Sequence, residues 1–584
     1  MTLKGNDKTA GRRLNPAGNQ SRKRGHDNEV LAWLMSGLFG VLSGLFLVWG
    51  YQLEKIDRID LSDRNANLVM LMLMIVMAVD AKHVWNNYNA AKKGEAKLFG
   101  LFVINTADVV SKKGDASSKA AGNTLLGKIP LKSGTFLFRW GMLILLNLPV
   151  LLAEYPGFFV YDAQDELNEV LTRTFSTHHP LLHVLILGGT IALVHKITRS
   201  WNLGIFAYML FQMLVITAIF AYVLGFMEKK GVGRKSRIIW MIYYGVFPTI
   251  VMFTLCSSKD GLFSALLLLL TVFLIRMVTE REAFLQDKKN VAAFILTAVL
   301  MPCFRHNGFY AYLVFVPFAL WYFRKELKKG FLTVFILPVF FYLIISKSLS
   351  MGFSSEITHH QEMLTVPIMQ LARVYTYEKD SMTKEDREIL TSYVPEENLN
   401  LYTPRVSDLI KIGFNNELYE QDSKSFWKLW AKNLTQHPMT YLNAWFLTSY
   451  GYWYPAAKIE VYEGTTVYTF TYDLNSYFGY EVEPPGERHS LIPALDSLYR
   501  YISIGCFFYD QPILGLLFAP GLLIFIYMFV LFYRISVRNF LGVLPFLPCI
   551  LTYLTVILGP TYLVRYVVYL WLCFPLIFVR FDNE

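Results

Sequence analysis

Long apolar stretches recur along the whole of this 584-residue sequence. Four of them are residues 30–50, 203–226, 331–345 and 513–533. A helix needs about 20 apolar residues to cross the core of a bilayer, and only helices or closed barrels satisfy their backbone there. The apolar residues run continuously instead of alternating, which favours helices. The sequence therefore predicts an all-α, polytopic transmembrane helix bundle with about 12 to 14 crossings.

Composition and charge also indicate a membrane protein. Only 17% of the residues are charged, whereas about 25% are charged in a typical soluble domain. The net charge of +10 is explained by basic loops, because basic residues mark the cytoplasmic ends of membrane helices. We therefore expect contact with membrane lipids and no nucleic-acid partner. The basic loops comprise residues 229–237, 288–289, 324–329 and 534–538.

Four regions follow from the pattern of charge and hydropathy. Residues 1–28 are basic and polar, with no cleavage site after the first apolar run, which predicts a disordered cytoplasmic tail and not a signal peptide. Residues 29–347 are predicted to form an N-terminal transmembrane bundle with an acidic outer loop at 154–179. Residues 348–511 are expected to form a mostly helical extracytoplasmic cap, and residues 512–584 to form C-terminal transmembrane helices.

The stretch between residues 180 and 226 conflicts with this topology. Two crossings there would place the basic residues 229–237 outside, against the positive-inside rule. The first piece, 181–194, is short for a crossing and contains His183. Either it is a partial or broken helix, or a boundary upstream is misplaced.

The acidic loop carries the candidate catalytic residues Asp162, Asp165 and Glu166. A carboxylate at the edge of the bilayer can act as a general base, because burial raises its pKa towards neutrality. The alternative is structural: Asp162 caps a helix, and the acids that follow it lie on the wet face of that helix.

Three histidines follow the acids, and the motif HHP is typical of a helix start with Pro180 in the first turn. His179 and His183 are four residues apart and share a helix face. That spacing suits a metal, but the HExxH signature is absent. We therefore predict substrate-binding or substrate-orienting roles for His178, His179 and His183, and no metal site.

Cationic groups stand at the predicted outer ends of several helices. An arginine can hold phosphate oxygens in a bidentate fork, and a lysine acts as a point charge, so these groups suit an anionic phosphate. The alternative is that they extend to the membrane surface without a ligand. The candidate substrate-binding residues of these segments and of the cap are Lys259, Asp260, Arg305, His306, Asn307, Arg373 and Arg565.

Taken together, these segments resemble a group of bacterial multispanning membrane proteins related to the GT-C glycosyltransferases. The resemblance covers roughly residues 155–569. It rests on the order of YPGFFVYDAQDEL, HHPLLH, SSKDGLFSA, FRHNGFYA, EMLTVPIMQLARV, HPMTYLNAWF, YWYP and GPTYLVRY. The resemblance implies a GT-C-like fold in the bacterial plasma membrane, with the N-terminus in the cytoplasm. It also implies inverting transfer of a sugar from a polyprenyl-phosphate donor to a glycan or lipid acceptor of the cell envelope, on the outer face.

The resemblance also implies roles for individual residues. Asp162 best matches the essential acid of the first outer loop, with Asp165 or Glu166 as alternates. Lys259–Asp260 match the later acidic site of the group. Two departures are that the adjacent Asp-Glu pair stands three residues after Asp162, and that Leu181 replaces the second proline of a His-Pro-Pro motif. Some enzymes of this class use a divalent cation, but no ligand set here predicts one, and no other cofactor is expected.

In the scheme that follows, Asp162 accepts the proton of the acceptor hydroxyl. Arg305, Lys259 and Arg565 stabilise the charge that develops on the leaving phosphate. Two other functions remain open: an oligosaccharide polymerase or ligase, which would use cap cations such as Arg373 and Arg405, and a lipid-linked glycan transporter. A transporter would favour paired broken helices in two halves of the chain, and no such pairing is evident.

Overall fold

The computed structural model describes residues 16–92, 135–353, 355, 360–458, 466–468, 474, 478–504, 507–559 and 561–579. Helices make up the regular structure of these residues, and pairing between extended segments is confined to isolated bridges such as Phe158 with Cys256. Seven helices in the described part of the chain are long and apolar enough to cross a membrane, or up to nine if each bent pair is one span. The prediction of an all-α polytopic helix bundle is confirmed.

The expected 12 to 14 crossings exceed this count because several apolar segments form short helices, among them 540–556 and 564–578. The seven long helices are α1 (Pro16–Ile56), α2 (Arg64–Lys92), α4 (Phe136–Ala153), α6 (Leu181–Thr198), α7 (Trp201–Lys229), α10 (Lys259–Glu280) and α14 (Phe331–Gly352). Shorter or bent elements complete the bundle: α8 (Arg234–Val246), α9 (Pro248–Thr254), α11 (Glu282–Gln286), α12 (Lys288–Leu300), α13 (His306–Tyr322), α25 (Pro520–Ser536), α26 (Leu547–Val556) and α27 (Tyr569–Cys573).

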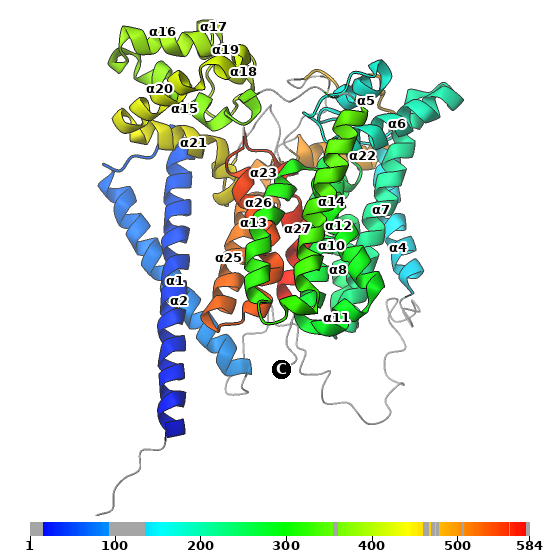
Figure 1. Cartoon of the computed structure of the whole chain (residues 1–584), viewed down its shortest axis with the longest axis vertical. Coiled ribbons are helices and arrows are strands. Elements are labelled where there is room, and N and C mark those ends of the chain that lie inside the picture. Colours follow the sequence, from blue (N-terminus) through cyan, green and yellow to red (C-terminus); the bar gives the residue numbers. More distant parts are fainter. Residues whose placement is uncertain are drawn as a thin grey trace, which may run out of the picture.

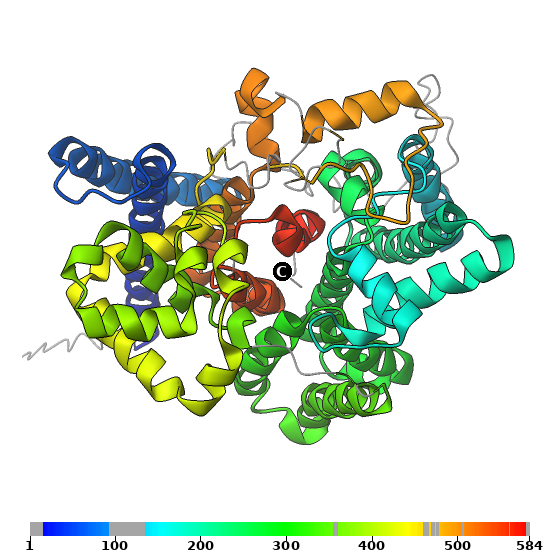
Figure 2. The same ribbon diagram turned by 90° about the horizontal axis from the view of Figure 1, so that it is seen from above.

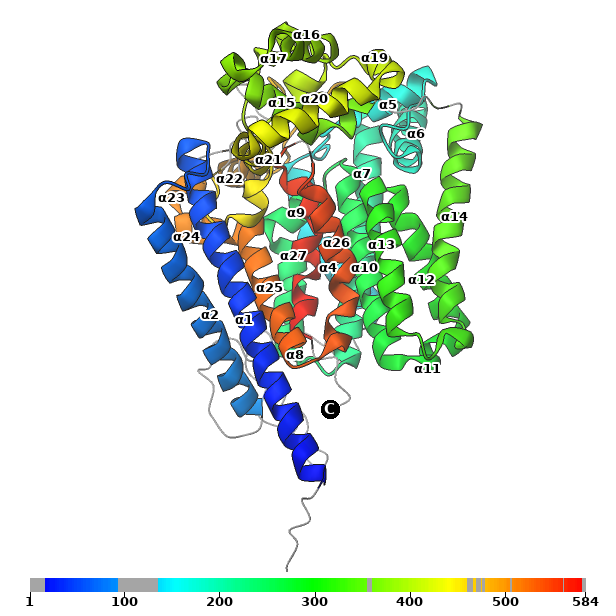
Figure 3. The same cartoon turned by 60° about the vertical axis from the view of Figure 1, so that its left-hand side comes forward.

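The predicted tail and the first basic loop lie largely outside the described residues. Residues 1–15 and 93–134 are not described, and α1 already begins at Pro16, inside the stretch expected to be disordered. Figure 3 shows α1 and α2 as an antiparallel pair on one flank of the bundle, with α14 on the other flank.

The basic loops gather at one end of the bundle. At the start of α4, Arg139 pairs with Glu228 at the end of α7, and Glu228 also pairs with Arg237 in the first turn of α8. Arg281, directly after α10, pairs with Glu326 in the loop after α13. Figure 1 shows this end opposite to the cap formed by α15–α20.

Helix α6 resolves the topological conflict. It is one continuous helix of 18 residues, not a broken one, but it lies across the cap end of the bundle together with α5 (Ala163–Thr172) (Figures 1 and 2). His195 stacks on Trp201 and His183 meets Tyr208, so α6 packs against the first turns of α7. Between residues 180 and 229 the chain therefore crosses the bundle only once, through α7. This single crossing places the basic residues 229–237 at the end opposite to the cap, with the other basic loops.

The cap has a hydrophobic core of its own. Its helices are α15 (Thr365–Tyr377), α16 (Lys384–Tyr393), α17 (Glu396–Leu399), α18 (Asp408–Lys411), α19 (Asn416–Gln421) and α20 (Ser423–Gln436). Leu371, Phe414 and Phe426 lie in this core, which is separate from the core of the bundle. Helix α21 (Pro438–Trp453) leads from the cap back into the bundle, where it packs against α25 and α1. A mostly helical cap region is therefore present.

Candidate functional site

A cluster of charged side chains lies where the α4–α5 link meets the start of α10. The two backbones are paired: Phe158 N–H donates to Leu255 O (3.0 Å), and Ser257 N–H donates to Phe158 O (3.0 Å). The Ser257 hydroxyl donates to Val160 O (2.7 Å). This pairing places the acidic residues after Val160 beside Lys259 and Asp260, which are far away in the sequence.

Asp162 occupies a strained turn at the beginning of α5. Tyr161 and Asp162 have φ angles of 65° and 71°, in the left-handed region that costs a non-glycine residue about 1–3 kcal/mol and is typical of functional sites. The Asp162 side chain makes no capping hydrogen bond to α5. Instead its carboxylate accepts from both terminal nitrogens of Arg565 (3.2 Å each). Asp162 is thus the N-cap residue of α5 by position, but its side chain does not cap the helix, so the interpretation that it only caps α5 is wrong.

The arginines of the cluster are each held between a carboxylate and an aromatic ring. Arg305 pairs with the buried Asp260 and lies 4.4 Å from the centre of the Tyr566 ring. The Arg565 Nε lies 3.8 Å from the second oxygen of Asp260, and its guanidinium lies 4.7 Å from the Tyr161 ring. Asp260 thus joins the two arginines, and Asp162 extends the chain of charges from Arg565.

Lys259 connects this ionic chain to a second set of buried groups. Its amine donates to His179 Nδ1 (2.8 Å) and lies 3.5 Å from Glu166 and 3.9 Å from Asp162. Glu166 pairs in turn with His183, which lies inside α6 and is fully buried. Glu166 and His183 are shielded from solvent, so in this structure they lie behind Lys259 and not on the exposed side of the cluster, where a direct contact with a substrate was expected.

The electrostatics of the acids differ from the expectation of a raised pKa. Burial raises the pKa of the Asp162 carboxyl, but the charges of Arg565 and Lys259 outweigh burial and hold it well below its usual range. Burial is likewise outweighed at Glu166, where His183 and Lys259 lower the pKa to about 2. Burial and the charge of Lys259 lower the pKa of His179 to about 3, so its imidazole is neutral and accepts from Lys259. Asp165 is exposed on α5, and its pKa is raised by partial desolvation and by the Asp162 charge.

A further carboxylate, Glu483, was missed by the sequence analysis. It accepts hydrogen bonds from the backbone N–H groups of Asp162 (3.2 Å) and Gln164 (2.8 Å), while its own N–H donates to Phe159 O (2.8 Å). Only 5% of Glu483 is exposed. Burial raises its pKa to about 8, and the negative charge of Asp162 adds to this effect. No motif surrounds Glu483, so only the fold reveals that it supports the strained turn.

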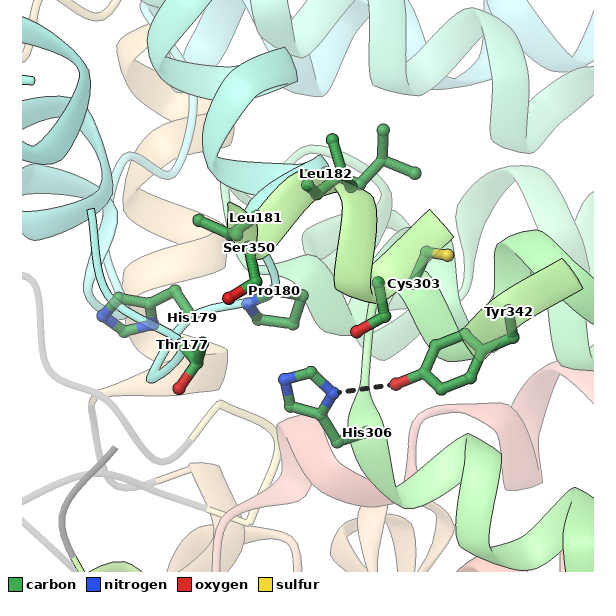
Figure 4. A pocket seen from close by; sticks show the side chains of 11 residues that line it. Thr177, His179, Pro180, Leu181, Leu182, Cys303, His306, Tyr342 and Ser350 are labelled. Carbon is green, nitrogen blue, oxygen red and sulfur yellow. Dashed lines mark hydrogen bonds between the residues drawn. The ribbon is translucent and has the colours of Figure 1, made fainter. Parts of the chain in front are cut away.

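A pocket lies beside the cluster, between the start of α6, the start of α13 and the second half of α14. It spans about 370 Å³, a volume that includes space open to solvent. His179 lines it and also contacts Lys259, so the pocket and the cluster share a wall. Figure 4 shows His306 opposite, with its Nδ1 3.1 Å from the Tyr342 hydroxyl.

The remaining predicted residues are placed as follows. His178 is exposed next to His179, and Asn307 is half-buried in the first turn of α13, next to Arg305 and His306. Arg373 is not part of the cluster: in α15 it donates to Asp57 O (2.7 Å) and to the Tyr402 hydroxyl (3.2 Å). Its prediction as a substrate-binding residue came from charge alone, and in the structure it fastens the α1–α2 link to the cap. In the described part of the chain, no three His, Cys, Asp or Glu side chains are grouped as metal ligands.

A family model matches residues 169–584 of this chain, most of its length. The chain belongs to DUF6020, a family of unknown function. The matched part contains Lys259, Arg305, Glu483 and Arg565, whereas Asp162 lies just before it. No curated protein and no solved structure shows a significant match to the chain.

Proposed function

We propose that this DUF6020 protein is a membrane glycosyltransferase that moves a sugar from a polyprenyl-phosphate donor to a glycan or lipid acceptor of the cell envelope. One observation carries the proposal: a half-exposed carboxylate, Asp162, is held directly against two cations, Arg565 and Lys259, at one end of a membrane bundle. In such an arrangement the carboxylate can accept a proton, and the neighbouring cations can stabilise an anionic leaving group.

The polarity of the bundle supports an outer-face site. The basic loops lie at the end opposite to the cluster, and basic residues favour the cytoplasmic side. In a bacterial plasma membrane, the cluster and the cap would then face outwards and the N-terminus would be cytoplasmic.

The donor phosphate would bind to Arg305, Lys259 and Arg565. Their side chains are 14%, 13% and 10% exposed, so a ligand at the cluster can reach them while the surrounding protein excludes most water. Charge-assisted hydrogen bonds from arginine and lysine suit phosphate oxygens. The prenyl chain would remain among the bundle helices, in contact with membrane lipids.

Donor binding would activate Asp162. In the free protein the two cations hold its pKa low, which makes it a poor base. A bound phosphate shares those cations and adds negative charge beside the carboxylate, and both changes raise its pKa. The acceptor oxygen then forms a bond to the anomeric carbon, the bond from that carbon to the phosphate oxygen breaks, the phosphate leaves with the electron pair, and the hydroxyl proton passes to Asp162.

Among the carboxylates of the cluster, Asp162 is best placed for this role. Its side chain is 38% exposed, whereas those of Glu166 and Asp260 are 2% and 0% exposed. Asp165 is accessible, but it points from the exposed face of α5 and is not among the partners of the three cations. Inversion at the anomeric carbon follows from a single displacement by the acceptor.

The test is the exchange Asp162→Asn, with Asp165→Asn on the same helix as the matched control. Purified variants would be incubated with a panel of synthetic polyprenyl-phosphate sugars and a lipid extract of the cell envelope, and sugar transfer would be followed by mass spectrometry. We expect Asp162→Asn to lower transfer by about 10²–10⁴-fold, the usual contribution of a general base, and Asp165→Asn to lower it less than about threefold. Equal activity of both variants with the wild type would refute the assignment of the base, and no transfer from any donor by the wild type would count against the function.

A further inference from the structure

Behind the cluster, a row of four side chains runs from Glu166 into the core of the bundle. Glu166 pairs with His183 Nδ1, and His183 Nε2 lies 2.7 Å from the Tyr208 hydroxyl. The Tyr208 hydroxyl lies 2.9 Å from Gln212 Oε1. Each of these residues is at most 1% exposed. Their hydrogen-bonding partners are therefore the neighbouring protein groups and not solvent water.

The far end of the row sets the direction of its hydrogen bonds. Gln212 Nε2 lies 2.6 Å from Cys256 O and 3.0 Å from Thr254 O. Both partners are backbone carbonyls, which can only accept, so the amide nitrogen must face them and the amide oxygen must face Tyr208. The Tyr208 O–H therefore donates to Gln212.

This direction is passed on to His183. A phenol has one proton, and Tyr208 uses it towards Gln212, so its oxygen must accept the hydrogen bond from His183. His183 Nε2 therefore carries a hydrogen. A neutral imidazole with its hydrogen there would turn a lone pair of Nδ1 towards the Glu166 carboxylate, which is repulsive in a buried site.

A second proton must therefore lie between His183 Nδ1 and Glu166. The other oxygen of Glu166 lies 3.5 Å from the Lys259 amine, and this positive charge favours an ionised carboxylate. We infer that His183 is an imidazolium in the resting protein and forms a buried ion pair with Glu166, in which one proton is stored out of reach of solvent.

The role of this pair is to position Lys259. The imidazolium keeps Glu166 ionised in a buried place where a lone carboxylate would tend to take up a proton. The ionised Glu166 in turn holds the Lys259 amine between itself, His179 and Asp162. The groups that face His183 are Glu166 and Tyr208, with the Phe304 ring at 6.0 Å, and Lys259 and His179 follow behind Glu166. His183 is thus a positioning residue. This role rests on the proposed function, but the inferred charge state of His183 is independent of it.

The charge state can be read from the full-length protein in lipid nanodiscs. With ¹⁵N-labelled histidine, an imidazolium shows two protonated ring nitrogens, and a neutral ring shows one protonated and one bare nitrogen. The His183→Gln variant identifies the resonance by its loss, and the exposed His178 is an internal reference that should titrate. We expect both nitrogens of His183 to be protonated at pH 7.5. A bare nitrogen at this pH in the wild type would overturn the inference.

Two further variants separate the charge state from the positioning role. Tyr208→Phe removes the acceptor of the Nε2 hydrogen, and Glu166→Gln removes the counter-charge, so each should convert His183 to a neutral ring. Should His183→Gln not fold, the shift of the same resonance in either variant identifies it. In the transfer assay, His183→Gln should raise the KM for the donor by about tenfold with a smaller change in kcat, because Lys259 is displaced while Asp162 is not. An unchanged KM would refute the positioning role and leave the proposed function intact.

Discussion

Two places at the cap end join arginines to aspartates from distant parts of the chain, and they differ in what surrounds the charges. The first is the ionic cluster around Asp162, Asp260, Arg305 and Arg565. The second, which we call the cap junction, comprises Glu54, Asp57, Arg373, Arg405 and Tyr450. At the cap junction Arg405 pairs with Asp57 (2.7 Å), and the Tyr450 hydroxyl donates to Glu54 (2.8 Å).

At the cap junction the Arg405–Asp57 ion pair is partly open to water, and the buried Arg373 uses neutral partners. The side chain of Asp57 is 44% exposed, Arg373 donates to a backbone carbonyl and a tyrosine, and Arg405 also donates to Tyr450 (3.1 Å). Exposed ion pairs of this kind contribute about 0–1 kcal/mol. The cap junction therefore fastens the α1–α2 link to the cap.

In the ionic cluster, by contrast, the charges are concentrated and largely shielded. Asp260 is fully buried, Arg565 is shared by two carboxylates, and the most exposed member is Asp162, whose side chain is 38% exposed. Desolvated charges cost several kcal/mol unless they are paired. The comparison teaches that residue type and backbone strain do not separate a site from a fastening, since Asp57 also has a positive φ angle of 54°. Full burial of a carboxylate and the sharing of one arginine by two carboxylates do separate them.

Among the exchanges that compare the two places, the largest effect is expected when the shared arginine is replaced by lysine. Arg565→Lys keeps the charge but loses the planar fork that contacts Asp162 and Asp260 together, and an ammonium is not equivalent to a guanidinium. We expect sugar transfer to fall by about 10²–10³-fold, in the range found when a donor to a developing charge is lost.

The matched control is Arg405→Lys at the cap junction. Transfer by this variant should stay within about threefold of the wild type, because an exposed pair with one carboxylate tolerates the change. If both variants lost activity to the same degree, the distinction between site and fastening would fail.

An intermediate effect is expected at Glu483, on stability and its pH dependence. The folded-state pKa of about 8 lies above the value of about 4.3 for an unfolded glutamate. The protonated form therefore favours folding: this stability is fully present below about pH 4.3 and is lost as the pH rises towards about 8. The apparent Tm of the wild type in detergent should fall over this window.

Glu483→Gln mimics the protonated acid and should remove much of that decline, raising the apparent Tm at pH 8.5 relative to the wild type. Glu487→Gln, whose side chain is 79% exposed, is the control and should keep the wild-type profile. Identical profiles for all three proteins would show that Glu483 does not titrate between the two states.

The smallest effect is expected for Arg373→Gln. This exchange removes the hydrogen bonds to Asp57 O and Tyr402, which should lower stability by about 1–3 kcal/mol and change transfer less than about threefold. Thermal unfolding and the transfer assay measure the two quantities on one sample. A large loss of transfer with normal stability would instead favour a polymerase or ligase that binds a lipid diphosphate through the cap.

Much of the candidate site was visible as separate segments of the sequence. Asp162, Lys259, Arg305 and Arg565 were each singled out because an ionisable group next to an apolar helix is costly. The direction of the pKa shift at Asp162 was predicted wrongly, since burial was considered without the cations that accompany it. Glu483 and Tyr208 were missed because a carboxylate in an irregular segment and a tyrosine in an apolar helix have no periodic signal.

By itself the sequence determined the helical class, the membrane location and the end at which basic loops gather, because helix length, apolar content and charge are local properties of a chain. Only the tertiary structure decided that α6 lies across the end of the bundle, that Glu483 supports the Asp162 turn and that Arg373 fastens the α1–α2 link to the cap. Each of these depends on contacts between segments that are far apart in the sequence, and the free energy of such contacts is set by packing and desolvation, which no local pattern encodes.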